Sequence, residues 1–232
     1  MSVFTQKVVP ADPDVRMVAA ERLTFFADAV IAIAITLLAL ELPMPAGTTN
    51  AELLHSVAEH RGEYIAFVIS FVVIGAHWDG HHRVFRYVTS LGGRLSRLSM
   101  YWLLMQVVTP FATKVLTGDG AFQVRFGFYA AVQAAAGLLF LLMVREIRRN
   151  HLYRLGTPPG MFTNAIVRTG VLAGAFLVSI PMSFFTAYSY LCWIAMPVVT
   201  AIVMRILRRR AASITTGTGS LPRTQKSSPT TP

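Results

Sequence analysis

Asp28 lies near the start of a long apolar stretch, ERLTFFADAVIAIAITLLALELP, which runs from Glu21 to Pro43. An ionised carboxyl group inside a membrane costs several kcal/mol unless it is paired or hydrated. The next apolar run ends in AHWDGHHRVFR, where Trp78, His81 and their neighbours can donate hydrogen bonds to a carboxylate. We therefore expect Asp28 to form a polar clamp between two helices, and a direct proton relay is the alternative role.

The histidines of the same stretch raise the question of a metal site. His77 and His81 are four residues apart and share one side of a helix, and His82 follows directly. A membrane di-iron or zinc enzyme needs more ligands, and the remaining histidines are spread over separate loops. The sequence also contains no Walker loop, no dinucleotide-type glycine pattern and no Ser-His-Asp set. We predict no metal, no cofactor and no enzymatic activity.

The elements that position these residues are membrane-length helices. Of the 232 residues, 54% are hydrophobic and only 14% are charged, more apolar material than one soluble core of this size can bury. A helix needs roughly 20 apolar residues to cross the hydrocarbon core, and stretches of about that length occupy residues 22–42, 63–83, 95–116, 122–144, 164–188 and 189–207. We predict an all-α integral membrane protein with six transmembrane helices.

The basic residues indicate how these helices are oriented. Of the 21 lysines and arginines, only Arg61, Lys114 and Arg125 lie in the odd-numbered loops, and the others lie in the termini and the even-numbered loops. Cytoplasmic segments carry an excess of Lys and Arg, so both termini are predicted to be cytoplasmic. Because this clustering accounts for the net charge of +10, we expect a membrane-lipid environment and no nucleic-acid partner.

The chain divides into three predicted parts. Residues 1–20 show no helical period, and residues 211–232 are rich in Ser, Thr, Gly and Pro. We predict a flexible cytoplasmic N-terminus over residues 1–20, a membrane domain over residues 21–210 and a disordered cytoplasmic tail over residues 211–232. Arginine outnumbers lysine heavily, as in GC-rich bacteria, which favours the plasma membrane of a prokaryote as the location.

One face of the first helix carries a row of apolar side chains and one hydroxyl. At about 100° per residue, the row lies within about 60° of Ile33 and comprises Phe26, Ala29, Ile33, Thr36, Leu37 and Leu40. Asp28 points about 140° away from Ile33, so the carboxylate and the row do not act as direct neighbours. On the helical wheel alone, such a row favours packing against lipid or a core over a pore.

The stretch RLTFFAD, followed by AVIAIAITLLALEL, resembles the opening signature of the transmembrane protein 175 family of lysosomal and prokaryotic potassium channels, usually R-x-x-x-F-S-D. Arg22, Phe26 and Asp28 match this signature, and Ala27 stands where serine is usual. The missing serine hydroxyl removes one hydrogen bond, on the order of 1 kcal/mol, from the expected clamp.

Two later positions extend the resemblance over roughly the first half of the chain. Trp78 and His81 are similar to the family's Trp and His at the end of the second helix, and Pro110 and Phe111 are similar to its Pro-Phe pair in the third. The structural clamp that the resemblance implies consists of Arg22, Phe26, Asp28, Trp78 and His81.

The resemblance implies a potassium-preferring cation channel, a homotetramer in which the first helices surround a central pore. Ile33 is then expected to form a tight hydrophobic gate, and Leu37 and Leu40 form further rings outward. Thr36 is expected to offer hydroxyls to a partly dehydrated K⁺, the expected permeant ion. The sequence contains no re-entrant filter motif such as TVGYG.

Two alternatives remain open at this stage. A proton-conducting channel requires only a transient water wire through the hydrophobic ring, and histidine is the side chain whose ordinary pKa lies nearest to neutral pH. A secondary transporter is the alternative from another class, although it predicts inverted repeats and broken helices that the sequence does not reveal.

Overall fold

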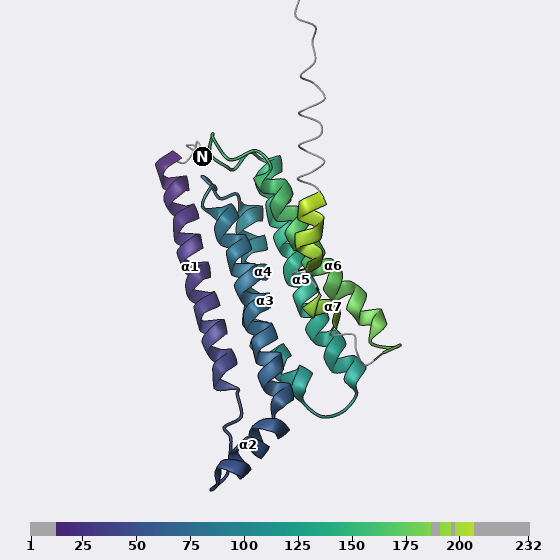
Figure 1. Cartoon of the computed structure of the whole chain (residues 1–232). Helices are drawn as coiled ribbons and strands as arrows, with labels where there is room; N and C mark the ends of the chain where they lie inside the picture. Colours follow the sequence, from purple (N-terminus) through teal and green to yellow (C-terminus); the bar gives the residue numbers. More distant parts are fainter. Residues whose placement is uncertain (1–12, 187–190, 196–197, 207–232) are drawn as a thin grey trace, which may run out of the picture.

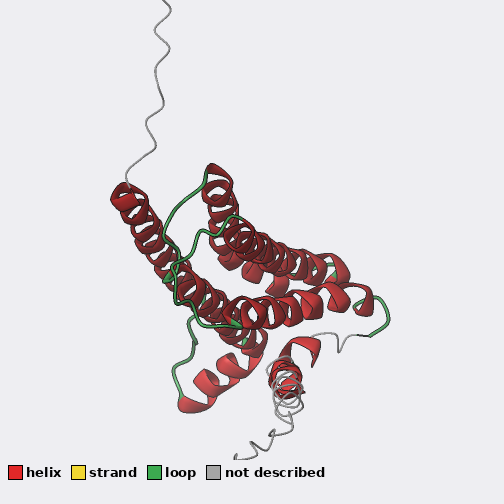
Figure 2. Ribbon diagram, turned by 90° about the horizontal axis from the view of Figure 1, so that it is seen from above, coloured by secondary structure: helices red, strands yellow, loops and turns green. Residues whose placement is uncertain are grey.

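The computed structural model describes residues 13–186, 191–195 and 198–206. Within these residues the long helices lie side by side in one all-helical bundle, as Figures 1 and 2 show from the side and from above. The helices are α1 (Pro13–Leu40), α2 (Asn50–Glu59), α3 (Arg61–Phe85), α4 (Gly93–Thr117), α5 (Phe122–Arg149), α6 (Met161–Met182) and the short α7 (Leu191–Ile194). Residues 198–206 are also helical.

Four helices in the described part of the chain are long and apolar enough to cross a membrane. They are Met17–Leu40, Arg61–Phe85, Phe122–Arg149 and Met161–Met182, and they overlap the first, second, fourth and fifth predicted ranges. The 25-residue α4 overlaps the third range, and its length spans roughly 37 Å, but it is more polar than these four. The sixth range falls partly outside the described residues, so the total of six spans stays a prediction.

The ends of two helices differ from the predicted ones. α1 begins at Pro13, although residues 1–20 were predicted to be flexible, because proline fits the first turn of a helix and the following residues are good helix formers. Residues 1–12 and the tail 211–232 lie outside the described residues. α6 ends at Met182, six residues before the predicted boundary at 188, and a turn follows.

α1 lies at the edge of the bundle, where it contacts α3 and α4 (Figure 1). Its buried side chains recur every three or four residues, namely Ala20, Leu23, Ala27, Ile31, Ala34 and Leu38. Three of these are alanines, and small side chains let two helix backbones approach closely in a membrane. This stripe determines which face of α1 is left open.

Polar side chains connect α3, α4 and α5 inside the bundle. Ser70 bridges Thr113 (2.8 Å) and Tyr129 (3.0 Å) through its hydroxyl. Gln133 donates to the Thr109 hydroxyl at 3.2 Å. Hydrogen bonds between buried side chains add to van der Waals packing in membrane bundles, so this network fixes the three helices against which α1 packs.

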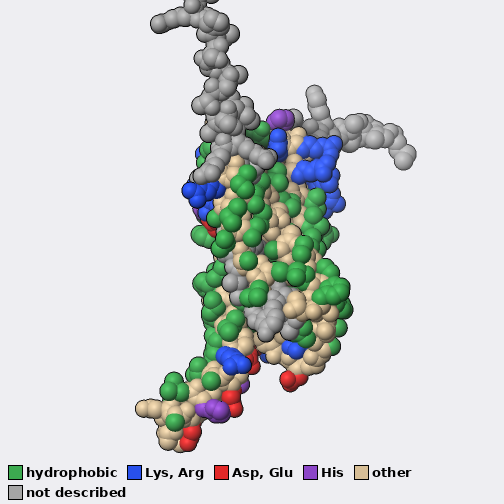
Figure 3. Space-filling model, turned by 45° about the vertical axis from the view of Figure 1, so that its right-hand side comes forward, with side chains coloured by type: hydrophobic (Ala, Val, Ile, Leu, Met, Phe, Trp, Pro, Cys, Tyr) green, Lys and Arg blue, Asp and Glu red, His purple; other side chains and the backbone are tan. Residues whose placement is uncertain are grey.

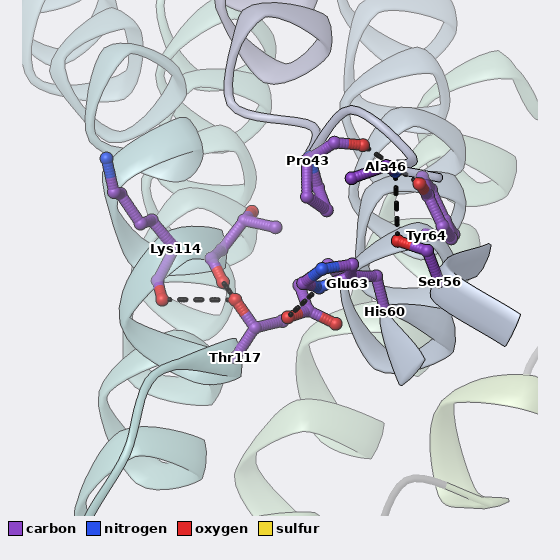
Figure 4. A network of polar contacts seen from close by, with 9 residues as sticks. Pro43, Ala46, Ser56, His60, Glu63, Tyr64, Lys114 and Thr117 are labelled. Atoms are coloured by element: carbon purple, nitrogen blue, oxygen red, sulfur yellow. Dashed lines mark hydrogen bonds and ion pairs between the residues drawn. The ribbon is translucent and has the colours of Figure 1, made fainter. Parts of the chain in front are cut away.

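A twenty-residue connection between α1 and α3 is held against the bundle at the end opposite the start of α1. Figure 4 shows the Tyr64 hydroxyl, which donates to the Pro43 carbonyl at 2.8 Å, and the Ala46 N–H, which donates to Ser56 Oγ at 3.1 Å. The connection contains the unpredicted helix α2, whose N-terminus has a capping box formed by Thr49 and Glu52. Hydrogen bonds from Thr48 lower the pKa of the Glu52 carboxyl.

Charged side chains are distributed unevenly along the bundle. In Figure 3, Lys and Arg gather mostly at one end, hydrophobic side chains cover the middle, and acidic side chains lie mostly at the other end. The basic end comprises the C-terminal ends of α3 and α5 and the start of α4, which carry Arg83, Arg86, Arg94, Arg97, Arg145, Arg148 and Arg149.

A glycine of α5 lies close to α6. A Cβ atom added to Gly137 would lie 2.7 Å from Ala173 Cβ, so α5 and α6 would have to move apart. We expect Gly137→Ala to lower the free energy of unfolding by about 1–3 kcal/mol, which thermal unfolding of the purified protein measures. The matched control is Gly127→Ala on the same helix, where the added Cβ would meet no atom within 4 Å. An equal rise in stability for both variants would contradict this packing.

Candidate functional site

The open face of α1 contains the predicted apolar row. Ile33 is 59% exposed, Leu37 41% and Leu40 80%, and Phe26 and Thr36 are exposed as well. These residues lie opposite the buried stripe that contacts α3 and α4. In a single chain, the face is therefore available to lipid or to other copies of the protein.

Thr36 is the polar member of this row. Its hydroxyl donates to the Ile33 carbonyl at 2.8 Å, within the same helix. Because the hydrogen is directed at the backbone, the Thr36 oxygen keeps lone pairs that face outward. Such an oxygen can contribute one ligand to a hard cation, but a single hydroxyl per chain replaces little of a hydration shell.

Asp28 lies outside the open row, half-buried between α1 and α3. The Trp78 indole donates its N–H to Asp28 Oδ1 at 2.9 Å. His82 stacks on the same indole, with ring centroids 5.3 Å apart. The hydrogen bond between Asp28 and Trp78 therefore links α1 to α3.

The structure does not bring the other predicted clamp residues to Asp28. His81 lies three positions after Trp78, and the rotation of about 60° between them directs its ring into the bundle. There it stacks between Phe85 (3.9 Å) and Trp102 (4.7 Å), and its side chain is fully buried. Arg22 is exposed, and in the described part of the chain no hydrogen bond or ion pair joins it to Asp28. Of the predicted clamp residues, only Trp78 is joined to Asp28 by a hydrogen bond in the described part of the chain, and the clamp role stays a prediction.

Ala27 occupies the position where the resemblance expects serine. Its side chain is buried in the stripe that packs against the bundle, one position before Asp28. The substitution therefore affects the contact between helices and leaves the open face of α1 unchanged.

An ion pair that the sequence analysis missed fixes the far end of α1. Glu41 directly follows the last residue of α1, and its Oε2 atom lies 2.5 Å from Lys114 Nζ of α4. Both side chains are largely exposed, so the pair contributes about 0–1 kcal/mol. From Ile33 to Leu40, the open row thus lies between two polar attachments, one at Asp28 and one at Glu41. The opposite charges were visible in the sequence, but their proximity depends on how α1 and α4 pack.

The buried histidine His77 contacts a side chain of the neighbouring helix α4. Its Nδ1 atom lies 3.2 Å from Nε2 of Gln106, a contact between α3 and α4 that the sequence analysis also missed. Among the residues that the structure describes, no group of three or more His, Cys, Asp or Glu side chains is arranged to hold a metal ion.

A family model described as endosomal/lysosomal potassium channel TMEM175 matches residues 22–110. This segment contains most of α1, all of α2 and α3, and most of α4, and with them the open row, Asp28 and Trp78. The chain is 32% identical over 174 residues to a potassium channel of Streptomyces collinus, an alignment that covers 70% of this chain and 84% of that protein.

Two further comparisons extend over most of the chain. The endosomal/lysosomal proton channel TMEM175 of Gallus gallus is 31% identical over 224 residues, which cover 88% of this chain but only 44% of that protein. The crystal structure of a lysosomal potassium-selective channel TMEM175 homolog from Chamaesiphon minutus matches the fold with a TM-score of 0.66 and 24% identity. The match covers 80% of this chain and 97% of that chain.

Proposed function

The chain belongs to the TMEM175 family of ion channels, and on this premise we propose that it is a potassium-preferring cation channel in the plasma membrane of a prokaryote. Members of this family are channels and not enzymes. The observation that carries the proposal is the open face of α1, where an outward-facing hydroxyl lies within an aliphatic row. The name of the Streptomyces relative supports the preference for potassium.

In the proposed assembly, four copies surround an axis with their α1 helices. Each chain crosses the membrane six times, and its termini lie in the cytoplasm together with the basic end. The charge asymmetry along the bundle supports this orientation. The buried stripe of α1 contacts its own α3 and α4, so the open row is free to face the same row of the other copies.

The proposed conduction path is a series of side-chain rings. A ring of Ile33 side chains cannot hydrogen-bond water, so it stays dry and blocks ions until the α1 helices move. Leu37 and Leu40 form wider rings on the side away from the basic end. Thr36 offers hydroxyls next to the Ile33 ring, and this implies a modest preference for K⁺ over Na⁺.

Thr36→Ala tests the proposed selectivity. Removal of the hydroxyls takes away the polar ligands of the path, so we expect the reversal potential in mixed K⁺ and Na⁺ to move towards that of an unselective pore. Thr24→Ala is a matched control, because Thr24 donates to the Ala20 carbonyl on a partly buried face of the same helix. A preference for K⁺ that persists in Thr36→Ala would exclude Thr36 as the selectivity residue.

The general test is ion flux. The purified full-length protein is reconstituted into liposomes, and K⁺, Na⁺ and H⁺ fluxes are compared under identical gradients. We expect K⁺ flux to exceed Na⁺ flux. The second candidate, a proton channel, is favoured by the name of the Gallus gallus relative and predicts H⁺ flux without K⁺ flux. No flux of any of these ions would contradict both candidates.

A further inference from the structure

Two neighbouring hollows lie along the outward face of α5. The first is an apolar groove of about 340 Å³ between α5 and α6, lined by Ala131, Ala135, Leu138, Gly170, Gly174 and Leu177 among others. Its floor consists of small side chains, and leucines form part of its walls. A groove of this kind in a membrane helix pair accepts a flexible hydrocarbon chain without any polar partner.

The second hollow lies at the basic end, between the start of α4 and the last turns of α5. It measures about 160 Å³ and is lined by Arg94, Leu142, Arg145, Glu146 and Arg149. Arg94 Nε lies 3.6 Å from Glu146 Oε2, and the Asn150 amide donates to Glu146 Oε1 at 2.7 Å. In the described part of the chain, neither Arg145 nor Arg149 pairs with a carboxylate. Three guanidinium groups therefore face one carboxylate, which leaves a net positive charge.

The two hollows follow one helix face in a fixed order. Leu138, Leu142, Arg145 and Arg149 are three or four residues apart, so they share the side of α5 that points away from the bundle. From Leu138 to Arg145 the helix rises by roughly 10 Å, which leads from the apolar groove to the basic pocket. An apolar groove that leads to unpaired arginines matches the two parts of an anionic phospholipid, which are an acyl chain and a negatively charged headgroup.

We propose that this face of α5 binds one anionic phospholipid, with its phosphate between Arg94, Arg145 and Arg149 and one acyl chain in the groove towards Gly174. The inference rests on the proposed orientation, in which the basic end lies at the cytoplasmic leaflet. One arginine guanidinium group can donate two hydrogen bonds to a phosphate, and basic clusters next to membrane helices recognise anionic headgroups. A second copy of the bundle is the competing occupant of the groove.

Lipid binding by the full-length protein tests this proposal independently of ion flux. The delipidated protein is titrated with phosphatidylglycerol, phosphatidylcholine or inorganic phosphate, and bound lipid is counted by native mass spectrometry. We expect phosphatidylglycerol alone to be retained. The double variant Arg145→Gln and Arg149→Gln should bind it roughly thirtyfold more weakly, because each arginine near an anionic surface contributes a factor of about five. Arg148→Gln, outside the pocket, is the matched control and should bind like the parent.

A second pair of variants tests the groove. Gly174 lines the groove, and an added Cβ there meets no atom within 4 Å, so Gly174→Phe places a ring in the groove and should also weaken retention of phosphatidylglycerol. Gly127→Phe, whose Cβ is likewise unobstructed and which lies outside the groove, should not. Unchanged binding in the double arginine variant, equal retention of phosphatidylcholine, or equal occupancy by inorganic phosphate would overturn the proposal. So would a change in oligomer size in Gly174→Phe with lipid binding intact, since a second copy would then be the occupant.

Discussion

Ile33→Asn is expected to raise the basal K⁺ flux of the reconstituted protein by at least about tenfold. Isoleucine at the proposed constriction excludes water, and an amide in its place donates and accepts hydrogen bonds, so the ring becomes hydrated at rest. A tenfold rise corresponds to about 1.4 kcal/mol removed from the permeation barrier. The measurement is K⁺ flux into liposomes that contain equal amounts of correctly assembled protein.

The control for this variant replaces another exposed aliphatic residue in a membrane helix. Val72 of α3 is 58% exposed, much like Ile33, but it lies on a different helix from the proposed pore. Val72→Asn should leave the flux unchanged. Equal fluxes for Ile33→Asn and the parent, or an equal rise for Val72→Asn, would count against Ile33 as the gate.

Asp28→Ala is expected to destabilise the folded, assembled protein. The variant leaves the Trp78 N–H without its acceptor and frees α1 from α3 at this level. Hydrogen bonds to charged groups contribute about 1.5–3 kcal/mol, so we expect a clear drop in melting temperature and in the assembled fraction during size-exclusion chromatography. Asp28→Asn keeps an acceptor oxygen without the charge, so its melting temperature and its assembled fraction should fall less than those of Asp28→Ala.

The partner residue supplies the control for the clamp. If Trp78 and Asp28 act through one bond, the double variant Trp78→Phe and Asp28→Ala should be less destabilised than the sum of the single variants. Additive losses would show that the two residues act separately. A fully stable assembly of Asp28→Asn with altered ion selectivity alone would show that Asp28 belongs to the conduction path and is not a clamp.

Length and periodicity were sufficient to predict the main features of α1. Apolar length placed its C-terminal end within two residues of the observed one, and the helical wheel separated Asp28 from the row that contains Ile33. The residues resembling the family signature pointed to the family that the comparisons then confirmed. These properties depend only on the local sequence, which is why they could be read without a structure.

Contacts between helices were harder to predict, because they depend on how each helix is rotated. Trp78 and His81 are close in sequence and both can donate hydrogen bonds, yet only Trp78 faces α1. The bond between Gln106 and His77 likewise follows from the packing of α3 against α4. Helix α2 is a different case, because the sequence does contain its capping box at Thr49 and Glu52, but the helix is too short to show a membrane-length signal.

The exposed row of α1 is compatible with either lipid or a pore, because both leave these side chains uncovered in one chain. The proposed function depends on the second possibility. Charge and hydropathy patterns do not distinguish the two environments, since each favours aliphatic side chains at this depth. Only a measurement on the assembled protein separates them.

Block of K⁺ flux by a charged, water-soluble thiol reagent makes that distinction most directly. Leu37→Cys, Leu40→Cys and Val72→Cys are introduced separately into a chain that carries Cys192→Ser. If the row lines the conduction path, the reagent should reduce flux through Leu37→Cys and Leu40→Cys and leave Val72→Cys unaffected. Flux that remains unchanged after treatment of both row variants, with their thiols still unreacted, would place the row against lipid and contradict the account.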